Sequence, residues 1–133
     1  MASAIASSSA ANVWIVRTGP NTSRNDAEIV QREVFGPVLT VQTFAGEDEA
    51  IALANSTDYG LAAIVYTGAQ DRADRIGRAV RAGTVWVNTF LVRDLTAPFG
   101  GTRQSGIGRE GGDYALDFYS DLKTLQILDG SVS

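Results

Sequence analysis

The sequence predicts an α/β domain with a mainly parallel sheet flanked by helices. Short apolar and β-branched runs at 38–44, 61–67 and 84–89 have strand composition. Segments with helical spacing, about 10 to 14 residues long, separate these runs, and strands that alternate with helices usually pair in parallel through right-handed crossovers. Because 133 residues with 44% hydrophobic content can bury one core, we expect a single domain.

The first eleven residues, MASAIASSSAA, form a low-complexity Ala/Ser tail that we expect to be disordered. The tail has no basic start and only a weak apolar stretch, so we expect no secretory signal. The folded domain then covers residues 12–133. Its first strand, 12–18, is followed by a cluster of turn residues at 19–23.

Two helical segments are expected on either side of the strand at 38–44. Residues 26–32 have room for a turn or two of helix before Pro37 stops it. Acidic residues at 47–49 open a longer helix, because they complement the positive end of the helix dipole. We predict that Gly60 closes this helix in a left-handed conformation.

The strand at 61–67 is apolar enough to be buried on both faces. The helix after it has an apolar face, and we expect Gly83 to end it. Its arginines lie on other faces, close to aspartates, and are predicted to form a solvated surface. The apolar residues are Ala69, Ala73, Ile76 and Val80, and the arginines are Arg72, Arg75, Arg78 and Arg81.

The C-terminal part is predicted to form a short helix at 113–119 and a final strand at 122–128. The alternating apolar residues of this strand suit the edge of a sheet. Since an exposed edge often pairs with another chain, we expect a homodimer or a larger oligomer formed through this strand.

The stretch between 89 and 112 is rich in Gly, Pro and Arg and is predicted to be a long loop. Loops of this length in compact domains are usually functional, so we expect the functional site here. The loop contains two arginines, two carboxylates and two aromatic rings, which are Arg93, Arg109, Asp94, Glu110, Phe90 and Phe99.

The composition excludes several classes of function. The chain has no Cys and no His, which excludes thiol nucleophiles, Ser/His/Asp triads and Cys/His zinc sites, and we expect no metal. A net charge of −4 argues against nucleic acid as a partner. No apolar run approaches the roughly 20 residues of a membrane span. We expect a soluble, cytoplasmic protein that acts on a small molecule.

Four motifs occur in order along the chain: EVFGPV at 33–38, NSTDYGL at 55–61, GTVWVN at 83–88, and PFGG at 98–101 followed by SGIGRE at 105–110. Together they resemble the C-terminal third of the NAD(P)-dependent aldehyde dehydrogenases, over about Val13 to Leu128. The segments RDL and REGG, which begin at Arg93 and Arg109, are most similar to hydroxymuconic and aminomuconic semialdehyde dehydrogenases.

The resemblance implies roles for individual residues. Glu33 would hydrogen-bond the nicotinamide ribose and Phe35 would pack near the nicotinamide ring, as a vestigial cofactor site. Phe99 and the residues just after Asn88 would line the substrate tunnel, and we expect Asn88, Phe90 and Phe99 to contact the substrate. Arg93 would hold the carboxylate of a semialdehyde, which suits a planar guanidinium. Structural alternatives stay open, in which Glu33 stabilises a turn and Arg93 forms a surface ion pair.

The catalytic cysteine, the general-base glutamate and the dinucleotide-binding domain of the resembling enzymes lie upstream, where this chain has only the Ala/Ser tail. The resemblance is therefore to a truncated aldehyde dehydrogenase domain. We expect no dehydrogenase activity from the chain alone and no cofactor, with NAD bound only if a nucleotide-binding partner complements it.

Two functions follow from these observations. In the first, the chain catalyses cofactor-independent isomerisation, dehydration or cyclisation of an oxygen-rich molecule. Arg93 or Arg109 would hold an anionic oxygen there. Asp94, Glu33 or Glu110 would transfer the proton, with a pKa raised by apolar neighbours. In the second, the chain is a non-catalytic fragment, or a subunit that completes a separately encoded aldehyde dehydrogenase oxidising a semialdehyde with NAD.

Overall fold

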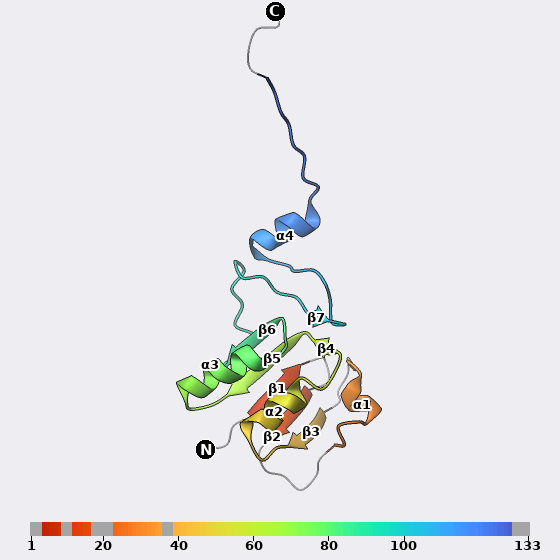
Figure 1. The fold of residues 1–133 in the computed structure, drawn as a ribbon, viewed down its shortest axis with the longest axis vertical. Coiled ribbons are helices and arrows are strands. Elements are labelled where there is room, and N and C mark those ends of the chain that lie inside the picture. Colours follow the sequence, from red (N-terminus) through yellow and green to blue (C-terminus); the bar gives the residue numbers. More distant parts are fainter. Residues whose placement is uncertain (1–3, 9–11, 17–22, 36–38, 129–133) are drawn as a thin grey trace, which may run out of the picture.

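The computed structural model describes residues 4–8, 12–16, 23–35 and 39–128, and its centre is a five-stranded sheet in the order β3-β2-β1-β5-β6 (Figure 1). Strands alternate with helices from β3 to β6, which confirms the predicted α/β class. The strands are β1 (Ala4–Ser8), β2 (Asn12–Val16), β3 (Leu39–Thr43), β4 (Tyr59–Gly60), β5 (Ala62–Tyr66), β6 (Thr84–Val87) and β7 (Thr102–Arg103). The helices are α1 (Glu28–Gln31), α2 (Glu47–Ala54), α3 (Gln70–Ala79) and α4 (Gly112–Tyr119).

The large sheet is mixed, with parallel pairs at its two sides. β2 pairs with β3 and β5 pairs with β6 in parallel, whereas β1 is antiparallel to both β2 and β5. The prediction of a disordered tail is therefore wrong for residues 4–8. These residues also form the strand that departs from the predicted parallel pairing, because both of its neighbours are antiparallel to it. A β-ladder is made by backbone groups alone. An Ala/Ser segment without a strand pattern can therefore fill the gap between β2 and β5.

The hydrophobic core lies between this sheet and helices α2 and α3. Helix α2 contacts β1 and β2, helix α3 contacts β5 and β6, and the two helices contact each other. The buried face of α3 contains Ala73 and Ile76, as predicted from their spacing. The core cluster consists of Phe44, Ala50, Ala54, Ala63, Val65, Ile76 and Val80.

An ion cluster also joins α2 to α3. Arg72 and Arg75 of α3 both pair with Glu47 at the start of α2. The Glu47 side chain is 27% exposed, so this cluster is partly shielded from water. The predicted solvated arginine surface is therefore incomplete, because two of the four arginines connect the helices.

Neither predicted helix-ending glycine has that role. Helix α2 ends at Asn55, and Gly60 pairs with β7 in strand β4, where a Cβ would lie 2.5 Å from the backbone oxygen of Arg81. Helix α3 ends before Val80, and a Cβ on Gly83 would lie 1.7 Å from the backbone oxygen of Gly100. Each glycine instead allows two segments of backbone to approach closely, because it has no side chain to separate them.

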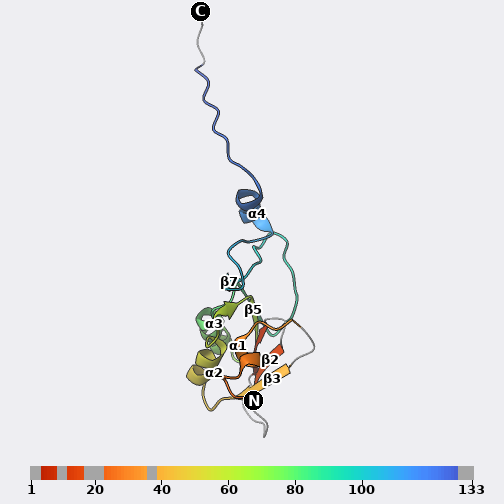
Figure 2. The same ribbon diagram turned by 90° about the vertical axis from the view of Figure 1, so that its right-hand side faces the viewer.

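The predicted C-terminal helix is present as α4, but the predicted strand at 122–128 is not. Figure 1 and Figure 2 show residues 120–128, which follow α4, running away from the rest of the protein as an extended segment. A strand requires a partner for its backbone groups, and no described segment pairs with this one. Among the residues that the structure describes, no helix is long and apolar enough to cross a membrane.

Replacing Ile76 by alanine should destabilise the fold strongly. Ile76 is 2% exposed and belongs to the core cluster, and such a truncation typically costs about 2 to 5 kcal/mol of unfolding free energy. Urea denaturation followed by circular dichroism measures the change. Ile107→Ala is the matched control, because Ile107 is 96% exposed. Equal losses in the two variants would contradict this assignment of the core.

Candidate functional site

The loop predicted to be functional begins at Asn88, which directly follows strand β6 and has a left-handed backbone conformation with φ of 53°. The Asn88 side chain accepts a hydrogen bond from Thr67 N and donates one to Thr67 O, each 2.8 Å. Its backbone N–H donates to Val65 O at 2.8 Å. Asn88, predicted to contact substrate, therefore extends the β5–β6 pairing by one residue in this structure.

A cavity of about 160 Å³ lies between strand β6 and the first half of the loop. Trp86 forms part of its wall and donates from Nε1 to Val92 O at 2.9 Å. Phe90 meets the Trp86 ring edge-on, with 6.0 Å between centroids, and is not among the lining residues. The cavity is lined by Thr84, Val85, Trp86, Val92, Arg93, Asp94, Ala97, Pro98 and Phe99.

Arg93 is the cationic residue of this cavity. Its Nη2 donates to Glu110 Oε1 at 2.8 Å, and its guanidinium carbon lies 5.5 Å from the centre of the Phe99 ring. Both partners of the ion pair are about half exposed, so the pair contributes at most about 1 kcal/mol to stability. A guanidinium has five N–H donors. An anionic ligand can thus contact Arg93 at other nitrogens or compete with Glu110 for it.

Asp94 lies beside Arg93 in the sequence but has a different environment. It accepts hydrogen bonds from Thr96 Oγ1 (2.6 Å) and from Thr96 N (2.9 Å). The Thr96 side-chain bond, followed by the backbone bond, holds the pKa of Asp94 below its usual value of 3.8. The sequence interpretation required a raised pKa, so for Asp94 the direction is opposite to the one expected. A carboxylate that stays ionised in this way is a poor proton donor at neutral pH.

Glu33 belongs to a second cluster. Its Oε1 accepts a hydrogen bond from Ser105 Oγ at 2.8 Å, and Ser105 Oγ accepts one from Gly60 N at 2.9 Å. Phe35 is 71% exposed, and neither it nor Glu33 lines the cavity. The structure thus groups Arg93, Asp94, Phe99 and Glu110 in one place, and Glu33 with Ser105 in another.

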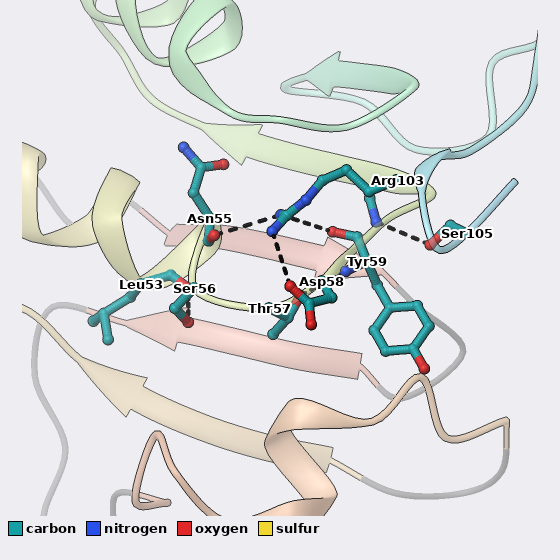
Figure 3. A network of polar contacts seen from close by, with 9 residues as sticks. Leu53, Asn55, Ser56, Thr57, Asp58, Tyr59, Arg103 and Ser105 are labelled. Atoms are coloured by element: carbon teal, nitrogen blue, oxygen red, sulfur yellow. Dashed lines mark hydrogen bonds and ion pairs between the residues drawn. The ribbon is translucent and has the colours of Figure 1, made fainter. Parts of the chain in front are cut away.

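The remaining predicted residue, Arg109, holds the loop itself. Its Nη1 donates to the backbone oxygens of Gly101 (2.6 Å) and Gly108 (2.8 Å). Ser105 and Arg103 are the polar residues that the sequence reasoning missed. Figure 3 shows the network that Arg103 forms with the turn after α2. The available signal for Ser105 was its place at the start of the SGIGRE motif, directly before Gly106.

No group of three or more Asp and Glu side chains that could hold a metal occurs in the described ranges. The polar atoms around the cavity are a guanidinium, a carboxylate and a hydroxyl, and its walls are largely apolar. Such a site suits a small organic molecule with a negative group.

Comparison with known proteins decides the family. The profile of the aldehyde dehydrogenase family matches residues 19–125, which is most of the chain. The chain belongs to the aldehyde dehydrogenase family. The resemblance inferred from the four sequence motifs is thereby confirmed.

Two similar curated proteins are semialdehyde dehydrogenases. The 2-hydroxymuconic semialdehyde dehydrogenase of Pseudomonas putida is 45% identical over 116 residues, which cover 87% of this chain and 24% of that protein. The 2-aminomuconic 6-semialdehyde dehydrogenase of a Pseudomonas species is 48% identical over 109 residues, 82% of this chain and 22% of that protein. The chain therefore spans only about a fifth to a quarter of the length of these relatives.

In fold as well, this chain matches only one part of a longer aldehyde dehydrogenase. The NAD+ complex of an aldehyde dehydrogenase from Bacillus cereus superposes with a TM-score of 0.74 and 39% sequence identity, covering 90% of this chain and 23% of that one. The α/β fold of this chain is accordingly one part of the aldehyde dehydrogenase fold.

We predict that Asp94 titrates below the usual range for an aspartate and that Thr96→Val raises its pKa by removing the strongest hydrogen bond. A lowered folded-state pKa means that the stability gained from Asp94 is complete above its unfolded pKa. This stability is lost as the pH falls through the pKa that Asp94 has in the folded protein. A carbon-detected NMR titration of the Asp94 carboxyl measures both proteins.

Thr89→Val is the control for the titration, because no hydrogen bond joins Thr89 to Asp94 in the structure. The Thr89→Val substitution should leave the midpoint of the Asp94 titration unchanged. A wild-type midpoint at or above 3.8, or an unchanged midpoint in Thr96→Val, would contradict the assigned cause.

Proposed function

We propose that this chain supplies one part of an NAD-dependent aldehyde dehydrogenase that oxidises a small semialdehyde, and that it is inactive by itself. The proposal is supported by the names of the relatives, which are dehydrogenases of hydroxymuconic and aminomuconic semialdehydes. Arg93 would hold the substrate carboxylate beside Phe99, while Glu33 and Phe35 would meet the cofactor.

The chemistry requires residues that these 133 do not contain. Oxidation of an aldehyde through a covalent thiohemiacetal needs a thiolate, and the chain has no cysteine. NAD would accept the hydride when bound. The parts of the reaction open to this chain are to hold the aldehyde's carboxylate, to shield it from water with the apolar cavity wall, and to orient the cofactor through Glu33.

The single observation that carries the proposal is the number of large apolar side chains exposed in the C-terminal part of the chain. Large apolar side chains are exposed along the first half of the loop, at Ile107, on α4 and on the extended segment after it. Helix α4 has no buried residue at all. Exposed apolar side chains in such number favour an interface, so we infer that further polypeptide covers them in the working enzyme. The residues are Phe90, Leu91, Val92, Leu95, Ile107, Tyr114, Leu116, Phe118, Tyr119, Leu122, Leu125, Ile127 and Leu128.

The cavity also favours a second candidate, which is the cofactor-independent isomerisation, dehydration or cyclisation of an oxygen-rich molecule. Arg93 would then hold an enolised oxygen in the cavity. Its support is weaker, because the pKa of Asp94 is lowered and Glu110 is engaged by Arg93. A proton carrier needs a pKa near the working pH.

A chimera tests the dehydrogenase proposal. Residues 19–125 of this chain, which match the family profile, should be able to replace the matching segment of the Pseudomonas putida 2-hydroxymuconic semialdehyde dehydrogenase, because the two proteins are 45% identical over 116 residues. We expect the chimera to form NADH from the semialdehyde, measured by absorbance, and the isolated chain to form none.

In the chimera, Arg93→Ala should lower kcat/KM for the semialdehyde by about tenfold or more, the cost of one charge-assisted contact. Arg75→Ala is the matched control on α3 and should not change it. A folded chimera that binds NAD but oxidises no aldehyde would refute the proposal, and turnover of a substrate by the isolated chain without NAD would favour the second candidate.

We also propose a homodimer or larger assembly formed through residues 122–128, whose backbone groups and apolar side chains would pair with a second copy. Sedimentation at micromolar concentration should give a mass of at least twice the 14.1 kDa of the chain. Ile127→Glu should reduce the assembly, whereas Ile29→Glu, on helix α1, should not. A monomer mass that does not change with concentration would refute the proposed assembly.

The cytoplasmic location of the protein stays a prediction.

A further inference from the structure

The loop from Phe99 to Glu110 is closed at its base by a pair of backbone hydrogen bonds. Phe99 N donates to Glu110 O and Glu110 N donates to Phe99 O, each at 2.7 Å. Within the loop, Arg103 has a left-handed backbone with φ of 59°. This conformation is unfavourable for an arginine unless surrounding contacts maintain it.

The side chain of Arg103 supplies such contacts, because it extends across the turn that follows α2 (Figure 3). Its Nη1 donates to Asn55 O (3.5 Å) and Tyr59 O (3.4 Å), and its Nη2 lies 3.6 Å from Asp58 Oδ1. The Asn55 carbonyl is at the C-terminal end of α2, where backbone oxygens form the negative end of the helix dipole. The guanidinium therefore binds the turn where negative charge collects.

Ser105 lies two residues further along and touches two distant segments at once. It accepts a hydrogen bond from Gly60 N and donates one to Glu33 Oε1. A serine side chain is short, so both bonds require the loop backbone to be accurately placed. The direction in which the chain leaves Arg103 decides that placement, because an extended backbone at residue 103 would carry Ser105 elsewhere.

Backbone contacts hold this part of the loop as well. Strand β7 pairs with β4, and Gln104 N donates to Asp58 O at 3.0 Å. Arg103 itself is paired with Tyr59 in this ladder, and Ser105 N donates to Thr102 O at 3.1 Å across residues 103 and 104. The backbone therefore shares with the Arg103 guanidinium in holding the left-handed conformation.

We propose that Arg103 is a positioning residue for Glu33. Its guanidinium maintains the left-handed backbone at residue 103, and this backbone directs Ser105 onto the Glu33 carboxylate. Ser105 then restricts rotation of that carboxylate, which fixes the oxygen that accepts a hydrogen bond from the cofactor ribose. The last step rests on the proposed dehydrogenase function, whereas the first two are properties of the chain alone.

NMR on the purified 133-residue chain tests the proposal. Arg103→Gln should speed hydrogen exchange at the Gly60 amide by about fivefold to tenfold, the effect of losing one hydrogen bond. It should also move the Glu33 carboxyl carbon signal toward its position in Ser105→Ala. Arg103→Asn should restore part of both effects, because asparagine adopts the left-handed backbone more readily than glutamine.

The amides of β5 separate positioning from general destabilisation, since their exchange should stay at the wild-type rate. Arg75→Gln is the matched control, because it also removes an arginine paired with a carboxylate, and it should leave Gly60 and Glu33 unchanged. In a folded Arg103→Gln protein, wild-type behaviour at both Gly60 and Glu33 would overturn the proposal. Equal effects of the Gln and Asn substitutions would overturn the backbone step.

In an active chimera, Arg103→Gln should raise KM for NAD while kcat is kept. A chimera without activity would refute the dehydrogenase function, yet the Gly60 and Glu33 measurements on the isolated chain would still decide the role of Arg103.

Discussion

The burial of strand β5 is the constraint on which the rest of the structure depends. Residues 62–65 are all buried, and the strand pairs with β1 on one side and with β6 on the other. Helix α3 packs against β5 and β6. The next residue after the strand, Thr67, donates one backbone hydrogen bond to the Asn88 side chain and accepts another from it. Because Asn88 begins the loop that contains the candidate site, the position of that loop is set by a strand whose residues 62–65 are all buried.

Elements whose pattern is local could be predicted from the sequence. The apolar run at 62–66 and the spacing of Ala73 and Ile76 identify β5 and α3, since a continuous apolar run and a helical spacing are both visible in neighbouring residues. The strand β1 was missed because its Ala/Ser sequence has no such pattern and its order comes from two distant partners. The predicted strand at 122–128 failed for the converse reason: the pattern is present, but no described segment of the chain pairs with it.

The candidate site shows the same division between local and distant information. Sequence placed Arg93, Asp94 and Phe99 near each other because they are close along the chain, and all three line one cavity. It could not show that Thr96 lowers the pKa of Asp94, because that depends on the turn formed by residues 94–97. Nor could it show that Ser105 reaches Glu33 across 72 positions. Partners far apart in sequence leave no local pattern in a single chain.

The contact between Gly83 and Gly100 limits how this family member can vary. A Cβ at position 83 would meet the backbone oxygen of Gly100, not a side chain. Most steric conflicts in a protein can be relieved by shrinking the opposing residue, but Gly100 has nothing left to remove. A side chain at position 83 therefore requires one of the two backbone segments to move apart from the other. The pair thus sets how closely the start of β6 and the loop can approach, and only two glycines permit that distance.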